Sequence, residues 1–240
     1  MTARALVDAL PAAGGELSIE GDEHHYLFRV RRLAVDDALI VADAAGQEAD
    51  ARVLAVDATT ARLAVGAPRD AIAERPRITV LQALIKGDRM EWCVEKLAEC
   101  GADAIVLVAS ARAVVRLDGE RASARRDRLA SIAKAAARQS RRAVPAVEGP
   151  VSLGEALRRA AACDLRLVCH PHAHESPLHV PPDVREVALL VGPEGGLAAD
   201  EVEAALAAGF EAVSLGRGVL RAETAGPVAC AAIRIGRAIA

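Results

Sequence analysis

The sequence predicts an α/β protein in which a small β domain, residues 1–70, precedes a parallel-sheet domain, residues 71–240. Two observations support this fold class. In the first domain, short segments rich in β-branched residues are separated by turns, a pattern typical of a small barrel or sandwich. In the second domain, apolar strands alternate with helical patterns, which predicts a parallel sheet covered by helices. A chain of 240 residues, 52% of them hydrophobic, can form both cores.

The composition argues against several classes of protein. Aromatic residues make up only 2% of the chain, which argues against RNA recognition by a sheet of stacking aromatics. The net charge of -3 means that a nucleic-acid partner must meet a local basic patch. The five cysteines form no C-x-x-C pair and fit reduced thiols in a cytosol. Because there is no signal-like N-terminus and no apolar run of membrane length, we expect a cytoplasmic protein that does not enter a membrane.

The first domain contains one predicted helix, at 22–33. It also contains three predicted strands, at 38–42, 51–56 and 61–65. In the helix, Leu27, Val30 and Leu33 recur at helical spacing, which predicts a buried stripe. The arginines of the helix lie mostly on its other faces. They form either a solvated surface or a patch that binds phosphate, since arginine forks match phosphate oxygens.

Beyond a linker at 67–76, strands and helices alternate. The predicted strands are 78–84, 104–108, 165–169, 187–191 and 210–215. The predicted helices are 89–100, 120–142, 151–161, 198–208 and an alanine-rich one that begins near 222. Asp88 is placed to cap the first of these helices, and Gly209 is placed to end the fourth.

The predicted helix at 120–142 is strongly basic. It has only two acidic residues against eight basic ones, which are Arg121, Arg125, Arg126, Arg128, Lys134, Arg138, Arg141 and Arg142. Its apolar residues form an inward stripe, so the basic side chains cover the outward faces. Few acidic residues are placed to pair with these basic residues at i,i+4 spacing. The basic faces of the helix therefore either bind an anionic partner or are simply solvated.

Two glycine-rich turns follow the last two predicted strands. They are Gly192-Pro193-Glu194-Gly195-Gly196 and Gly216-Arg217-Gly218. Ligands of α/β sheets bind at the carboxyl ends of strands, so we expect the two strands to be neighbours and their turns to form a cofactor site. Neither turn has the spacing of a dinucleotide fingerprint, and no phosphate loop occurs. Hydride transfer and nucleotide hydrolysis are therefore disfavoured, and group transfer from a bound cofactor is favoured.

Three alternate histidines, His170, His172 and His174, follow the strand at 165–169. Alternate spacing in a loop can bring two imidazoles together, but no thiol or carboxylate pair nearby completes a metal site. We therefore predict no metal, and interpret the segment as a polar loop that borders the ligand pocket.

The glycine-rich turns and several segments before and after them resemble those of the ribosomal RNA small subunit methyltransferase E family. The motifs that carry the resemblance run in order along most of the chain, at 82–91, Lys96 with Glu99, Gln139 with Arg142, Val144 and Pro145, 190–197, 214–216 and 220–225. His24-His25 with Arg29, Arg32 and Leu33 is similar to the N-terminal signature of the family.

The resemblance implies a C-terminal SPOUT-type domain with a deep trefoil knot and an N-terminal PUA-like β-barrel that binds RNA. It implies that S-adenosylmethionine is folded into the knot and held by the backbone of three loops. The implied reaction is methylation of N3 of a specific uridine in 16S ribosomal RNA. The implied partners are the small ribosomal subunit and a second copy of the chain in a homodimer.

The site residues follow from the motifs position by position. The implied cofactor loops contain Cys169, His170, Val191, Gly192, Pro193, Glu194, Gly195, Gly196, Leu215, Gly216, Val219, Leu220, Arg221 and Thr224. The expected RNA contacts are His25, Arg29, Arg32, Lys86, Arg89, Arg125, Arg138 and Arg142. Glycine suits the loops, because a missing Cβ lets backbone groups approach a ligand closely.

Methylation of uracil N3 requires that its proton be lost and the resulting negative charge stabilised. Arg221 is the first choice to stabilise that charge or to bind the phosphate of the nucleotide. The alternative for Arg221 is an ion pair with Glu223 or Glu194. Glu194, Glu223 and Gln139 are all candidates to position the base or accept the proton, and the sequence does not choose among them.

Some positions depart from the family pattern. They are Arg138 where the family commonly has Glu, Ala222 where Thr is usual, Pro227 near the start of the last helix, and Asp36-Asp37 where a Gly-Asp turn is usual. Two other functions remain open on the sequence. One is a non-catalytic RNA-binding or ribosome-assembly protein, and the other is a ribose 2′-O methyltransferase of the same superfamily. An NAD-dependent oxidoreductase is disfavoured by the absent fingerprint.

Overall fold

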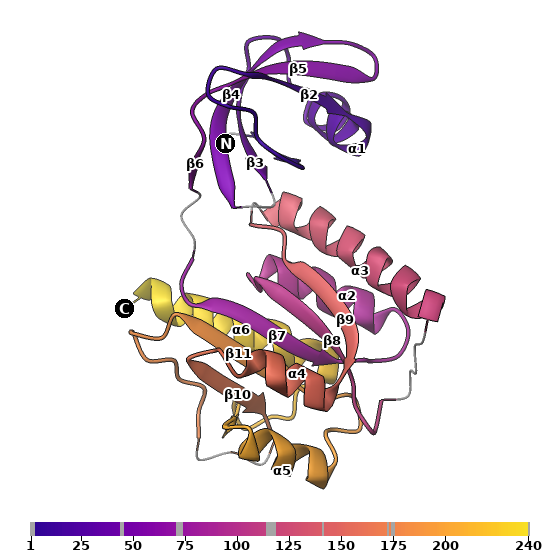
Figure 1. Ribbon diagram of the computed structural model, residues 1–240, viewed down its shortest axis with the longest axis vertical. Helices are drawn as coiled ribbons and strands as arrows, with labels where there is room; N and C mark the ends of the chain where they lie inside the picture. Colours follow the sequence, from indigo (N-terminus) through magenta and orange to yellow (C-terminus); the bar gives the residue numbers. More distant parts are fainter. Residues whose placement is uncertain are drawn as a thin grey trace. The chain divides into compact units, whose positions relative to one another are not determined.

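The computed structural model describes residues 3–43, 46–70, 74–113, 119–140, 142–171, 173 and 176–239. The chain divides into two compact units, Met1–Ala73 and Glu74–Ala240, called here the N-terminal and C-terminal units (Figure 1). The N-terminal unit has one hydrophobic core, and the C-terminal unit has two, one on each face of its sheet.

The N-terminal unit is a curled, largely antiparallel sheet. Its strands are β1 Ala3–Val7, β2 Glu16–Glu20, β3 Ala38–Asp43, β4 Gln47–Val56, β5 Thr60–Val65 and β6 Arg69–Asp70. They pair in the order β1-β3-β4-β5-β2, with β6 on β4, and only β1 and β3 are parallel. Buried and exposed residues alternate through most of β4, since one face of the sheet covers the core. The prediction of a small β domain is confirmed.

The predicted helix at 22–33 is shorter and wound differently. It consists of α1 Gly21–His24 and a π-helical segment, η1 His25–Val30. A π-helix has about one residue more per turn, which shifts the buried stripe. Leu27 and Phe28 are therefore buried, whereas Val30 is 60% exposed, so its predicted place in the stripe is wrong.

The turn after this helix keeps a glycine-like conformation without glycine. Asp36 stands where the family usually has Gly, and its φ is +74°, in the left-handed region. Asp is among the few residues that tolerate this region. The side chain of Asp37 accepts a hydrogen bond from the Ala34 N–H at 2.7 Å. Asp36 thus adopts a conformation that glycine would adopt without strain.

The C-terminal unit is built on a parallel sheet. Its strands are β7 Arg77–Ala83, β8 Ala104–Ala109, β9 Ala146–Ser152, β10 Leu165–Cys169, β11 Glu186–Val191 and β12 Glu211–Val213. They lie in the order β12-β10-β11-β7-β8-β9, and every neighbouring pair is parallel. The fold class is confirmed. The expectation that β11 and β12 are neighbours is wrong, because β10 lies between them.

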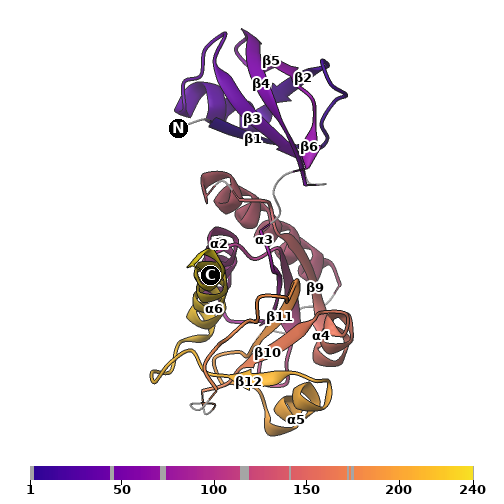
Figure 2. The same ribbon diagram turned by 90° about the vertical axis from the view of Figure 1, so that its left-hand side faces the viewer.

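Helices cover both faces of this sheet. α2 Arg89–Glu99, α3 Gly119–Ser140 and α6 Ala222–Ile239 pack on one face, and α4 Leu153–Ala160 and α5 Ala199–Ala207 pack on the other (Figure 2). Asp88 is at the N-cap of α2 but its side chain makes no capping hydrogen bond, so that prediction is wrong. α6 continues through Pro227. Among the described residues, no helix has the length and apolar character needed to cross a membrane.

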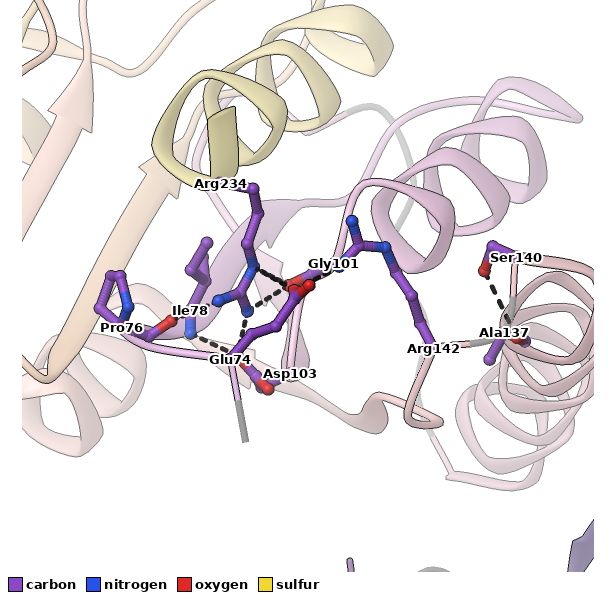
Figure 3. Close-up of polar contacts among 9 residues, drawn as sticks. All are labelled: Glu74, Pro76, Ile78, Gly101, Asp103, Ala137, Ser140, Arg142 and Arg234. Atoms are coloured by element: carbon purple, nitrogen blue, oxygen red, sulfur yellow. Dashed lines mark hydrogen bonds and ion pairs between the residues drawn. The ribbon is translucent and has the colours of Figure 1, made fainter. Parts of the chain in front are cut away.

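Arg234 anchors the later part of α6 to the beginning of the C-terminal unit (Figure 3). Its guanidinium is almost fully buried and donates to the carbonyl oxygens of Pro76 and Gly101, at 2.7 and 2.6 Å. It also pairs with the Asp103 carboxylate at 2.7 Å and the Glu74 carboxylate at 3.3 Å. A buried charge needs such partners. α6 is therefore fixed against β7 and the end of α2.

Candidate functional site

A pocket of about 900 Å³ lies at the carboxyl ends of β10, β11 and β12. Its walls are the turn after β11, the segment from Val213 to Arg221, the first turn of α6, and Cys169 with His170 after β10. This edge of a parallel sheet is where α/β proteins bind ligands, and the volume suits a nucleoside-sized molecule. The pocket therefore lies at the edge where the sequence predicted a site, although β11 and β12 are not neighbours.

The glycine-rich turn after β11 uses its glycines in different ways. A Cβ on Gly192 would lie 3.0 Å from the backbone nitrogen of Leu197, so the missing side chain lets the turn close on itself. A Cβ on Gly195 would meet nothing closer than 3.7 Å, the Cβ of Arg112. The turn is closed by a hydrogen bond from the Gly196 N–H to the Pro193 carbonyl at 2.9 Å. Gly192 is thus needed by the fold, while Gly195 leaves space in the pocket.

The wall formed by the segment from Val213 to Arg221 depends on Ser214, which was not among the candidate residues. Its hydroxyl accepts from the Gly216 N–H at 3.2 Å and donates to the Gly216 carbonyl at 2.9 Å. Gly216 has a φ of +115°, which side chains other than that of glycine rarely allow. The His170 N–H donates to the Val213 carbonyl at 3.0 Å and joins this segment to the end of β10.

Glu223 is the pocket carboxylate that has an incomplete set of hydrogen bonds. Its side chain is 10% exposed, and Oε2 is buried without a hydrogen-bond partner among the described residues. Oε1 lies 3.9 Å from Nη1 of Arg221, whose side chain is 80% exposed. The predicted alternative of an Arg221–Glu223 ion pair is thus present but long. A buried acceptor without a donor is unusual in a folded protein and marks a position where a ligand group or proton can be held.

A buried thiol and amide lie close to Glu223. Burial and the nearby Glu223 raise the pKa of the Cys93 thiol to about 12. Cys93 Sγ lies 3.5 Å from the amide oxygen of the fully buried Gln82. Gly226 of α6 lets this packing form, because a Cβ there would lie 3.1 Å from the same oxygen. Cys169 lines the pocket, and burial also raises its pKa to about 12, so it is a neutral contact and not a nucleophile.

Glu194 also lines the pocket, but its carboxylate is occupied. Oε1 accepts a hydrogen bond from the Lys86 N–H at 3.0 Å and lies 3.7 Å from Nη1 of Arg89. Both partners lie in the segment that joins β7 to α2, so Glu194 links this segment to the glycine-rich turn. The predicted ion pair of Arg221 with Glu194 is not what the structure shows, since Arg89 is the cation closest to Glu194.

Most of the expected cofactor and catalytic residues line the pocket, and two of them, Thr224 and Gln139, do not. All of the cofactor positions except Thr224 line it, and Gln139 lies exposed on α3 outside it. The lining residues outside the expected cofactor positions include Arg112, Pro171, Ser214, Gly218, Ala222 and Ala225. Pro171 and Gly218 nevertheless lie in segments that the sequence placed at the pocket. Arg112 follows the carboxyl end of β8. The rule that ligands bind at the carboxyl ends of parallel strands therefore also applied to this segment. Ser214 lies inside a motif of the resemblance.

The expected RNA-binding residues fall into two groups. His25, Arg29, Arg32, Lys86 and Arg89 are exposed. Arg125, Arg138 and Arg142 are more enclosed. Arg125 pairs with Glu91 at 2.8 Å, and Arg142 pairs with Glu74. Glu91, which pairs with Arg125 and Arg128 of α3, lies on α2, so the sequence of α3 alone suggested a scarcity of acidic partners.

The predicted absence of a metal stays a prediction. His172, His174 and Glu175 lie outside the described residues. Within the described part of the chain, no three His, Cys, Asp or Glu side chains are grouped so that they could hold a metal ion.

The pocket fits S-adenosylmethionine. Its volume accommodates a nucleoside with a short chain, its backbone turns offer N–H and C=O groups that side chains do not cover, and Glu223 offers an unused acceptor. A parallel α/β unit with this pocket, joined to a curled β unit, is the architecture of an RNA methyltransferase. Residues 73–234 match the model of an RNA methyltransferase domain, and residues 19–65 match that of an RNA methyltransferase PUA domain.

The chain belongs to the ribosomal RNA small subunit methyltransferase E family. It is 37% identical over 235 residues to the member from Mycobacterium bovis, a match that covers 95% of this chain and 90% of that protein. It is 32% identical over 226 residues to the member from Bacillus subtilis, covering 90% and 88% of the two chains. The crystal structure of the Neisseria gonorrhoeae member bound to S-adenosyl methionine has a TM-score of 0.86 at 28% identity, and the match covers 98% of each chain.

Proposed function

We propose that this protein uses S-adenosylmethionine to methylate N3 of a uridine in 16S ribosomal RNA. The observation that carries the proposal is the glycine-lined pocket, in which Glu223 retains a buried oxygen without a hydrogen-bond donor. Family membership supports the RNA substrate and the methyl donor. When bound, S-adenosylmethionine supplies a methyl group that its sulfonium already activates.

The residues of this chain must chiefly align the base and remove its proton. Neutral uracil N3 is a poor nucleophile, so the proton has to move to an acceptor as the N–CH₃ bond forms. Of the three candidates, Glu194 is held by Lys86 and Arg89, and Gln139 is outside the pocket, which leaves Glu223 as the acceptor. The exposed Arg221 guanidinium stabilises the negative charge that develops on the uracil oxygens.

The RNA is held through its phosphates. The target uridine has to leave its stack to enter the pocket, at a cost of a few kcal/mol. The exposed His25, Arg29, Arg32, Lys86 and Arg89 supply phosphate contacts. Arg125 and Arg142 form ion pairs with Glu91 and Glu74, so they are less available to phosphates than the exposed residues.

We further infer a knotted, homodimeric enzyme that acts in the cytoplasm on the small ribosomal subunit. The resemblance implies each of these properties. Exposed apolar side chains on α2 and α6, Trp92, Val228 and Ile235, support an interface with a second copy. The trefoil knot and the roles of Thr224 and Gln139 stay predictions.

The experiment is to incubate the purified protein with methyl-labelled S-adenosylmethionine and either naked 16S RNA or small subunits, and then to digest the RNA to nucleosides. Label in 3-methyluridine supports the proposal. Label in a 2′-O-methylated nucleoside identifies the ribose methyltransferase alternative. Tight RNA binding without any label identifies a non-catalytic assembly protein.

A further inference from the structure

The segment after β8 reaches the glycine-rich turn through an arginine that no motif singled out. Nη1 of Arg112 donates a hydrogen bond to the Gly195 carbonyl at 3.1 Å and lies 3.5 Å from the Leu197 carbonyl. These residues are more than eighty positions apart in the sequence. Arg112 also lines the pocket, so it contacts the turn on the side where the ligand binds.

A buried carboxylate joins the same two segments a second time. Glu201 of α5 is 8% exposed. Its Oε1 accepts from the Ala111 N–H at 2.7 Å, and its Oε2 accepts from the Ala198 N–H at 2.9 Å. Hydrogen bonds from backbone N–H groups to a buried carboxylate are among the stronger ones in proteins. Glu201 thereby fixes the position from which Arg112 extends.

The turn needs such external contacts because its own residues provide few. Three of its five residues are glycine, and Pro193 lacks an N–H. On its other side, the turn is held through the Glu194 carboxylate and the Lys86 N–H. β8 and β11 are separated by β7. Arg112 reaches the turn from the segment after β8, and Lys86 reaches it from the segment after β7.

We propose that Arg112 is a positioning residue for the methyl-donor site, which it serves by holding the carbonyls of the Gly195–Leu197 turn in place, with Glu201 holding Arg112's own segment. This inference rests on the proposed function, because it assigns the turn to the bound donor. Arg112 acts through the turn, and its contact with the donor is indirect.

The test compares two ligands by isothermal titration. S-adenosylmethionine carries an amino-acid chain, and 5′-methylthioadenosine lacks it. If Arg112 positions the turn, Arg112→Ala weakens both ligands by a similar factor, about ten-fold for the loss of these hydrogen bonds. Arg112→Gln, which can still donate to one carbonyl, restores part of the affinity without restoring the charge. Arg158→Ala, an exposed arginine on α4, is the matched control and leaves both affinities unchanged.

Hydrogen exchange gives a readout that needs no ligand. In the free protein, Arg112→Ala and Glu201→Gln should both speed exchange of the amides at 194–198, while the melting temperature of Arg112→Ala stays close to that of the control. Unchanged affinity for both ligands would overturn the proposal. Weakening of S-adenosylmethionine alone would also overturn it, because it would assign Arg112 to the amino-acid chain. A wild-type protein that binds neither ligand would instead contradict the proposed function.

Discussion

Two glutamates of the pocket have the same chemistry but different surroundings. Glu194 is bound by a backbone N–H that lies 108 residues earlier, whereas Glu223 keeps an oxygen without a donor. The sequence identified both and could not rank them, since the difference arises from contacts between distant segments. At this scale, residue type and position in a motif predicted which side chains line the pocket, and only tertiary contacts distinguished their roles.

The first prediction concerns Glu223. Glu223→Gln removes the proposed proton acceptor but keeps the size of the side chain, so turnover on ribosomal RNA should fall about 100-fold or more. The affinity for S-adenosylmethionine, measured by titration calorimetry, should change much less. An equal fall in donor affinity and turnover would assign Glu223 to donor binding and contradict its role as proton acceptor.

At the scale of the elements, two glycines of the turn after β11 have different roles. Gly192 is needed for the shape of the turn, and Gly195 leaves room in the pocket. Gly192→Ala would place a Cβ 3.0 Å from the Leu197 nitrogen. We expect the turn to shift at a cost of about 1–3 kcal/mol of stability, because forcing an extra methyl into a close contact costs that much. Thermal unfolding of the variant measures this cost.

Gly195→Ala is the matched variant. Its Cβ would make only an ordinary 3.7 Å contact with Arg112. We therefore expect unchanged thermal stability and weaker S-adenosylmethionine binding, and Gly195→Val should weaken binding further. Full affinity in both Gly195 variants would remove this part of the turn from the donor site.

The packing of α2 against α3 gives a prediction that depends on pH. The Glu91 carboxylate pairs with Arg125 and Arg128, each at 2.8 Å, and chiefly the hydrogen bond from Arg128 lowers the pKa of Glu91 below its usual 4.5. A lowered pKa stabilises the fold above the unfolded-state value, and this contribution is lost as the pH falls through the folded-state value. Glu91→Gln should therefore destabilise the protein by about 1 kcal/mol at pH 7.

Measuring the effect of Glu91→Gln at a second, lower pH provides the control for this prediction. The difference in unfolding free energy between wild type and Glu91→Gln should shrink as the pH is lowered below about 4.5. The Glu91 carboxylate of the unfolded wild type gains a proton there, whereas that of the folded protein gains one only at a lower pH. Denaturant unfolding at pH 7 and pH 3.5 measures the two differences. A difference that stays constant would mean that the ion pairs do not stabilise the packing of α2 on α3.

At the scale of the whole molecule, the sequence predicted the elements that have a strong local pattern. The apolar run of β11 and the acids and glycine that bound α5 predicted both elements almost to the residue. β9 was missed because Gly149 and Pro150 lie inside it, and such residues ordinarily interrupt a strand. The position of β10 between β11 and β12 could not be predicted either, since strand order depends on long-range pairing, which local patterns do not record.

The division into two units leads to a prediction about a fragment. Every residue that lines the pocket lies between Arg89 and Ala225, inside the C-terminal unit. A fragment of residues 74–240 should therefore bind S-adenosylmethionine with about the affinity of the full chain. It should bind RNA more weakly and with a smaller salt dependence, because His25, Arg29 and Arg32 are missing. A folded fragment that fails to bind the donor would show that the N-terminal unit contributes to the pocket.

The contacts of Arg234, which hold α6 in place, also bear on the order in which the pocket is completed during synthesis. A nascent chain of 225 residues already contains every residue that lines the pocket. It still lacks the guanidinium that joins α6 to the carbonyls of Pro76 and Gly101, made 158 and 133 residues earlier. The first turn of α6, which contains Glu223, is therefore secured only after residue 234 has left the exit tunnel. The pocket thus has all of its support only when almost all of these residues have been synthesised.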